Sequence, residues 1–177
     1  MVNHRNGHWA NIDSNSAHEG KDITVYAKRD IAAGEQLYLS YNECEDCDYA
    51  FTYVLHHILR DYGFVEQYPR RWNFFNNKII VQLEDTSITT DSSADASDLK
   101  LTWVSDRPTQ SSMRTLSKNL ERLKNMRDDF YFQVKKLDSS HERSVTLEFF
   151  DALVMALEQT IQYHDRLMVG SISGDDY

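Results

Sequence analysis

The sequence predicts an α+β protein from the pattern of its apolar residues. In the first half, short runs alternate apolar and polar residues, which is the period of half-buried β-strands. In the second half, apolar residues recur every three or four positions over two long stretches, which is the period of amphipathic helices. With 177 residues, the chain is long enough to bury a hydrophobic core.

The composition limits the classes of function. Nineteen lysine and arginine residues stand against 28 aspartate and glutamate residues, for a formal net charge of -9. This charge argues against direct binding of nucleic acid and allows a basic peptide partner. No apolar run approaches the ~20 residues that span a bilayer, and no secretory signal pattern opens the chain. We therefore expect an intracellular, soluble protein without a membrane partner, and the sequence does not distinguish cytoplasm, nucleus and plastid.

The first half is expected to contain a loop, two strands and a helix. Residues 1–20 are polar and rich in Asn, His and Ser, which predicts a loop. Residues 23–41 alternate in two runs around a turn at 33–35, which predicts two strands. A helix is expected over 48–62, with an aspartate as its cap, and Gly63 can end it in a left-handed conformation.

The composition changes after Trp72. Two further strands are predicted at 79–83 and 99–104. The residues between them, 85–98, are almost all Asp, Ser, Thr and Ala, a composition typical of a surface loop. We therefore expect 73–108 to be a strand pair joined by an acidic, Ser/Thr-rich loop.

The region 109–169 is predicted to be a helical hairpin. Apolar residues recur at helical spacing over 113–137, and a second stretch follows the sequence Ser139 to Glu142. Ser139 and Glu142 have the spacing of a capping box, so the second helix should begin there after a tight reversal. The small and acidic residues 170–177 predict a flexible tail.

Three short motifs lie in order within residues 1–72. They are Asn3-His4, Gly34-Glu35-Gln36-Leu37-Tyr38-Leu39-Ser40-Tyr41 and Tyr62-Gly63-Phe64-Val65-Glu66. Together they resemble the C-terminal half of SET-domain protein methyltransferases, in particular the branch of the plant Rubisco large-subunit lysine methyltransferase. The resemblance implies that residues 1–72 form the C-terminal part of a SET β-fold, with the first two motifs making its pseudoknot. The family's glycine-containing cofactor motif precedes the Asn-His motif, so we expect a chain truncated at its N-terminus that alone binds cofactor weakly or not at all.

The resemblance also implies a site for S-adenosyl-L-methionine and for a protein lysine. Asn3 would bind the amino-acid end of the cofactor through its amide, His4 the adenine edge through its main chain, and Phe64 would stack near the adenine. Tyr41 is the implied catalytic residue, and Tyr62 would be a wall of the substrate channel. Methyl transfer to an amine depends on positioning and on a neutral amine, and desolvation by aromatic walls lowers the pKa of a lysine.

Two functions compete on this basis. The first is a protein-lysine N-methyltransferase that uses S-adenosyl-L-methionine, with a lysine-bearing and possibly basic protein segment as its substrate. In the methyltransferase branch that this chain resembles, a helical C-terminal region helps to bind that substrate. Residues 109–169 occupy the corresponding position in this sequence. The alternative is a non-catalytic, SET-derived interaction scaffold with a helical hairpin. Binding of the cofactor distinguishes the two.

The sequence predicts no metal site. Cys44 and Cys47 are the only cysteines, and a structural zinc needs about four ligands. His56 and His57 are neighbours on a predicted helix and would point about 100° apart, so they do not complete a site.

Three further residues lie in or near the motifs, and their roles follow less directly from the sequence. Arg5 follows the Asn-His motif and would bring a cation close to a cationic cofactor unless its side chain points away. Tyr38 alternates with Leu37 and Leu39 and is predicted to pack in the core. Trp9 receives no role.

Overall fold

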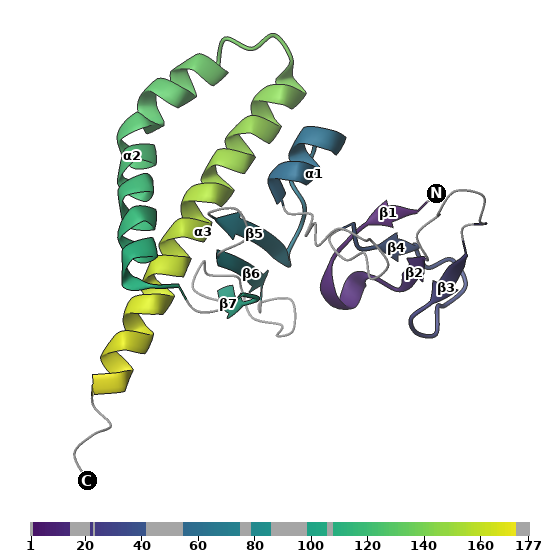
Figure 1. Ribbon diagram of the computed structural model, residues 1–177. Coiled ribbons are helices and arrows are strands. Elements are labelled where there is room, and N and C mark those ends of the chain that lie inside the picture. Colours follow the sequence, from purple (N-terminus) through teal and green to yellow (C-terminus); the bar gives the residue numbers. More distant parts are fainter. Residues whose placement is uncertain are drawn as a thin grey trace, which may run out of the picture. The chain divides into compact units, whose positions relative to one another are not determined.

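The computed structural model shows an α+β protein (Figure 1). It describes residues 2–14, 22, 24–41, 55–74, 79–85, 99–105 and 108–172. Three α-helices and three small sheets occur among these residues, which confirms the predicted class. The chain divides into two compact units, Met1–Arg71 and Trp72–Tyr177, next to the boundary that the composition suggests.

The first unit contains two small sheets, each made of two short strands. Strand β1 (Asn3–His4) pairs in parallel with β4 (Tyr38–Leu39), and β2 (Ile12–Ser14) pairs antiparallel with β3 (Val25–Ala27). A 3₁₀-helix, η1 (Gly7–Trp9), lies between β1 and β2.

The expectation of a loop over residues 1–20 is therefore wrong, because two strands and η1 lie there. Strands of two or three residues are too short to show a period in the sequence. They form because another segment of the chain supplies their hydrogen-bond partners. The two runs predicted in 23–41 do become strands, and each pairs with a strand near the N-terminus instead of with the other.

Asn11 ties three of these segments together and is fully buried. Its amide nitrogen donates to Glu35 Oε1 at 3.0 Å and to the carbonyl of Gln36 at 2.9 Å. Its amide oxygen accepts from the main-chain N–H of Tyr38 at 2.9 Å. Each polar atom of this buried side chain is satisfied, as a polar group without water requires.

Helix α1 (Leu55–Tyr62) ends as the sequence predicts. Gly63 follows it with φ of 73°, and its N–H donates to the carbonyl of Leu59 at 2.9 Å. Glycine adopts this left-handed conformation at little cost. The predicted cap and the first residues of this helix, 48–54, lie outside the described residues.

The second unit contributes to a three-stranded sheet in the order β5-β6-β7. Strand β6 (Ile79–Asp85) and β7 (Leu99–Trp103) pair antiparallel, with Leu83 opposite Leu101. Both predicted strands are confirmed. Strand β5 (Arg70–Phe74) spans the unit boundary and escapes prediction because its residues are largely polar. Residues 86–98 of the expected acidic loop lie outside the described residues.

Two long helices complete the second unit. Helix α2 (Gln110–Val134) begins after Thr109, whose hydroxyl accepts the N–H of Ser112 at 3.2 Å. Helix α3 (Ser140–Ile172) begins after Ser139, whose hydroxyl accepts the N–H of Glu142 at 3.2 Å, at the predicted capping site. Helix α3 runs through Ile172, so the expectation of a flexible tail is wrong for residues 170–172. Residues 173–177 lie outside the described residues.

The helices pack along each other and on the sheet (Figure 1). Phe130 of α2 stacks on Phe150 of α3, with ring centroids 4.3 Å apart. The ring of Trp103 in β7 lies beside that of Tyr163 in α3, with ring centroids 6.0 Å apart. Among the described residues, no helix combines the length and the apolar character that crossing a bilayer requires.

Candidate functional site

Four of the five residues singled out in the sequence meet in one aromatic cluster. It consists of His4, Tyr41, Tyr62 and Phe64. The centroid of the Tyr41 ring lies 4.8 Å from that of His4 and 4.9 Å from that of Tyr62. The centroid of the Phe64 ring lies 6.1 Å from that of His4 and 6.3 Å from that of Tyr62. The fold thus brings together three motifs that are separated by up to about 60 residues of sequence.

Local structure explains this meeting. The parallel pairing of β1 with β4 places His4 opposite Leu39, two residues before Tyr41. Tyr62 is the last residue of α1, and the positive φ of Gly63 turns the chain so that Phe64 follows on the same side of the cluster.

The cluster has an exposed wall. Tyr62 is 53% exposed, whereas Tyr41 and Phe64 are half-buried. Among the described residues, the hydroxyl of Tyr41 forms no hydrogen bond. A preorganised phenol therefore remains able to bind a further group.

His4 is held in one tautomer by its two neighbours. Its Nδ1 accepts the main-chain N–H of Tyr41 at 3.0 Å, so the proton of the neutral ring sits on Nε2. Nε2 donates to Glu66 Oε2 at 3.1 Å. The His4 side chain is 2% exposed. This ring is a buried link between the strand that carries Tyr41 and the segment that carries Phe64.

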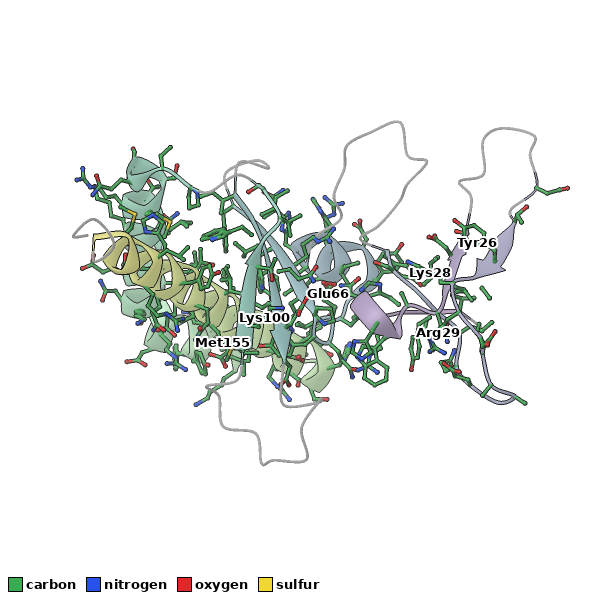
Figure 2. The ribbon with its side chains drawn as sticks, turned by 90° about the horizontal axis from the view of Figure 1, so that it is seen from below. Tyr26, Lys28, Arg29, Glu66, Lys100 and Met155 are labelled. Carbon is green, nitrogen blue, oxygen red and sulfur yellow. The ribbon has the colours of Figure 1, made fainter. Side chains whose placement is uncertain are left out.

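Glu66 is the centre of a buried polar network and is 1% exposed (Glu66 is labelled in Figure 2). Besides His4, it accepts from the amide nitrogen of Asn6, which lies 3.2 Å from both carboxylate oxygens. The same nitrogen donates to the carbonyl of Pro69 at 3.1 Å, and Ser40 Oγ donates to Asn6 Oδ1 at 2.8 Å. We call His4, Asn6, Ser40 and Glu66 the Glu66 network.

The network gives a structural reason for three polar residues of the motifs, His4, Ser40 and Glu66. A buried carboxylate is costly unless donors surround it, and His4 and Asn6 supply them. Sequence reasoning missed Asn6 and Ser40 and gave Glu66 no role beyond its place in a motif. The sequence offers no signal for them, because a polar residue is ordinarily expected at the surface.

The main chain of His4 faces away from its strand partner. The N–H groups of Asn3 and Arg5 donate to Leu37 and Leu39 of the β4 segment, both at 3.2 Å. Alternate residues of a strand point their main-chain groups in opposite directions, so those of His4 point away from β4. His4 as a whole is half-buried although its side chain is almost fully buried, so its exposure is mostly main chain.

Asn3 is the one predicted site residue outside the cluster. It lies beside His4 in β1 and is exposed. Within the described part of the chain, its side chain makes no hydrogen bond. Its amide is therefore able to contact a ligand bound along β1.

Arg5 points away from the aromatic cluster. Its guanidinium lies 3.8 Å from the centroid of the Trp9 ring and 5.8 Å from that of Tyr38. A cation over an aromatic face is attracted by the ring. The expectation that Tyr38 packs in the core is wrong, since the residue is half-buried.

The glutamate of the tyrosine motif holds a turn. Glu35 accepts from the N–H of Ala32 at 3.0 Å, from Asn11 at 3.0 Å and from the guanidinium of Arg29. The hydrogen bond from Arg29, followed by those from Ala32 and Asn11, lowers the pKa of Glu35 from 4.5 to about 2.

This shift predicts how stability depends on pH. Because the folded pKa lies below the unfolded one, Glu35 stabilises the fold fully above about pH 4.5. Its contribution is lost as the pH falls toward 2. We expect the thermal unfolding midpoint of Glu35→Gln to lie below that of the unaltered protein at pH 6. The two should converge as the pH is lowered to 2. Parallel curves, or the same convergence for Glu121→Gln on α2, would contradict this assignment.

Cys44 and Cys47 lie outside the described residues. The rings of His56 and His57 lie 4.1 Å apart, so the expectation that these side chains diverge is wrong. Burial lowers the pKa of both. Within the described ranges, no group of three or more His, Cys, Asp or Glu residues could hold a metal ion.

Comparison of the chain with protein-family models, with curated proteins and with solved structures found no match.

Proposed function

We propose that the first unit carries part of the site of a protein-lysine N-methyltransferase that uses S-adenosyl-L-methionine. The observation that carries the proposal is the aromatic cluster, in which the Tyr41 ring lies between His4 and Tyr62 with its hydroxyl unbonded among the described residues. The parallel pairing of β1 with β4 supports the further proposal that these segments are the pseudoknot of a SET fold.

The residues around the cluster suit part of the cofactor. The exposed amide of Asn3 and the outward main-chain groups of His4 offer donors and acceptors side by side along β1. Phe64 offers a half-buried aromatic face for the adenine. The cofactor, when bound, supplies an electrophilic methyl group on a cationic sulfur.

The tyrosines would act on the substrate amine. Tyr62 presents an exposed aromatic wall that removes water from a lysine side chain laid against it. Removal of water disfavours the charged ammonium and lowers the pKa of the lysine. The Tyr41 hydroxyl would then hold the nitrogen in line for displacement. The α2–α3 pair would help to bind the protein that carries the lysine.

Binding of S-adenosyl-L-methionine tests the proposal. Calorimetry would use the chain together with any sequence that its gene encodes ahead of Met1. We expect Phe64→Ala to weaken binding by about 1–3 kcal/mol, the usual worth of a base stacked on an aromatic ring. Phe132→Ala, which removes a ring that is 60% exposed on α2, should leave the affinity unchanged. The absence of binding, or equal losses in both variants, would favour the non-catalytic scaffold.

A further inference from the structure

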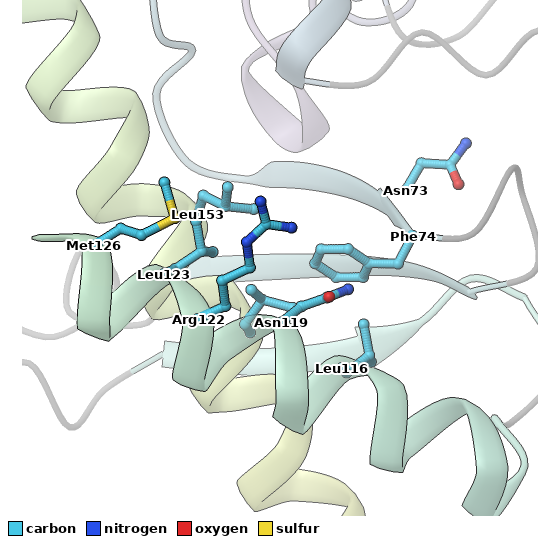
Figure 3. Close-up of a pocket in the computed structure, with 9 residues that line it drawn as sticks. Asn73, Phe74, Leu116, Asn119, Arg122, Leu123, Met126 and Leu153 are labelled. Carbon is cyan, nitrogen blue, oxygen red and sulfur yellow. The ribbon is translucent and has the colours of Figure 1, made fainter. Parts of the chain in front are cut away.

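A groove in the second unit is built from residues outside the aromatic cluster. It has a volume of about 420 Å³ and lies between α2, α3 and β5. Figure 3 shows the side chain of Arg122 reaching into it from α2 and the ring of Phe74 entering from β5. The volume lies within the range of sites that hold small molecules, about 300–1,000 Å³.

The lining of the groove is mostly apolar. Leu116 of α2 and Leu157 of α3 line it and are buried. Leu123 and Leu153 are half-buried, and Met126 is 45% exposed. Apolar surface of this kind gains free energy when the apolar part of a ligand displaces its water.

Two polar side chains of α2 stand together in this lining. Asn119 and Arg122 both line the groove and are three residues apart in the helix, so they are neighbours on the same side of α2. The guanidinium offers five N–H donors in a planar fork, and the amide offers two more. Among the described residues, neither side chain forms a hydrogen bond or an ion pair. The groove therefore combines an apolar lining with unused hydrogen-bond donors.

The next cations along α2 differ from Arg122 because they have partners within the chain. Lys124 pairs with Glu158 at 2.6 Å, and Arg127 pairs with Asp151 at 3.3 Å. The residues three or four positions from Arg122 on α2 are a lysine, two asparagines and a methionine, so none of these helical neighbours is a carboxylate. An external carboxylate can therefore pair with Arg122 without breaking an ion pair of the described residues.

We propose that this groove binds a small monocarboxylate with an apolar chain. The carboxylate accepts hydrogen bonds from the Arg122 guanidinium and the Asn119 amide, and the apolar chain lies along the leucines. A guanidinium matches the two oxygens of a carboxylate in a bidentate pair. One cation beside a neutral amide balances a single negative charge, which favours a carboxylate over a doubly charged phosphate monoester. This inference does not depend on methyl transfer, and binding to the groove needs no cofactor.

Three small molecules that differ in charge or in apolar chain test the proposal. Decanoate has both features, nonylamine has the same apolar chain with a positive charge, and acetate has the carboxylate without the chain. We expect the protein to bind decanoate, below its micelle threshold, more tightly than either of the other two in calorimetry. In NMR spectra, decanoate should shift the signals of the Arg122 Nε–H and of the Asn119 side-chain amide.

Matched variants locate the binding. Arg122→Gln should weaken binding of decanoate by about tenfold or more, because it removes a charge-assisted pair, and should not weaken binding of nonylamine. Arg114→Gln makes the same change at an exposed residue of α2 that does not line the groove, and should have no effect. Met126→Ser should also weaken binding of decanoate, whereas Met168→Ser, at a 53% exposed residue of α3 outside the groove, should not. Circular dichroism checks that each variant keeps its helices.

Several outcomes would overturn the proposal. Equal affinities for decanoate and nonylamine would exclude recognition of a carboxylate. Unchanged binding of decanoate in Arg122→Gln, or NMR shifts confined to other residues, would exclude this site. Self-association that Met126→Ser abolishes would assign the groove to a second copy of the chain. Absence of decanoate binding would refute the proposal outright, and binding of a leucine-rich helical peptide that requires Met126 would then assign the groove to a protein partner.

Discussion

Tyr41→Phe is expected to lower the rate of methyl transfer by about 100-fold or more, the usual effect of losing one preorganised donor at a reacting centre. The change removes only the hydroxyl. The ring contacts with His4 and Tyr62 need no oxygen, and the hydroxyl forms no hydrogen bond among the described residues. The fold should therefore be unaffected, and the loss should appear in turnover more than in cofactor affinity.

The chain offers a matched control for this experiment. Tyr38→Phe makes the same change three residues earlier, on β4, where the ring faces Arg5 instead of the aromatic cluster. Transfer of a labelled methyl group to a lysine-bearing protein, measured under single-turnover conditions, compares the two. Turnover near that of the unaltered protein for Tyr41→Phe would remove Tyr41 from the proposed role.

Glu66→Ala is expected to destabilise the first unit by about 3 kcal/mol or more. The substitution leaves His4 Nε2–H and the amide of Asn6 buried without their carboxylate acceptor. Hydrogen bonds to a charged group are each worth about 1.5–3 kcal/mol, and a donor left unpaired in the interior adds its own desolvation cost. Because His4 also accepts from Tyr41, loss of Glu66 should loosen the segment that carries the proposed catalytic hydroxyl.

Hydrogen exchange of individual amides measures this effect where it arises. The N–H of Tyr41 and that of Arg5, which donates to Leu39, should lose protection in Glu66→Ala. Glu66→Gln keeps the volume and one acceptor and should cost less. Glu84→Ala removes a half-exposed carboxylate near Lys100 and should cost less than about 1 kcal/mol. Unchanged protection of the Tyr41 amide in Glu66→Ala would show that the network does not hold the site.

Local signals in the sequence predicted the elements that depend on local interactions. The long apolar periods of α2 and α3, the serine before α3 and the glycine after α1 act within a few residues, and each lies where expected. A helix satisfies its main chain from its own neighbours, so its ends can be predicted from nearby residues. The motifs likewise marked the four residues of the aromatic cluster.

Elements that depend on distant partners could not be predicted in this way. Strand β1 has two residues and pairs with β4, which lies more than 30 residues later in the sequence. Strands β2 and β5 are short or polar, and each becomes a strand by pairing with the next strand along the chain. Arg5 had two possible directions in the sequence, and its contact with Trp9 settled which one it takes.

The same division runs through the candidate site. The motifs showed most of the aromatic and polar residues that form the site, because residue type sets the chemistry. The motifs did not show which polar residues are buried together. In the sequence alone, Asn6, Ser40 and Glu66 look like ordinary surface residues, and only the fold brings them into one network. Burial and hydrogen-bond pairing are properties of contacts between segments about 30 to 60 residues apart. Those contacts make Glu66 a buried centre of the site, and among the described residues none of them uses the hydroxyl of Tyr41.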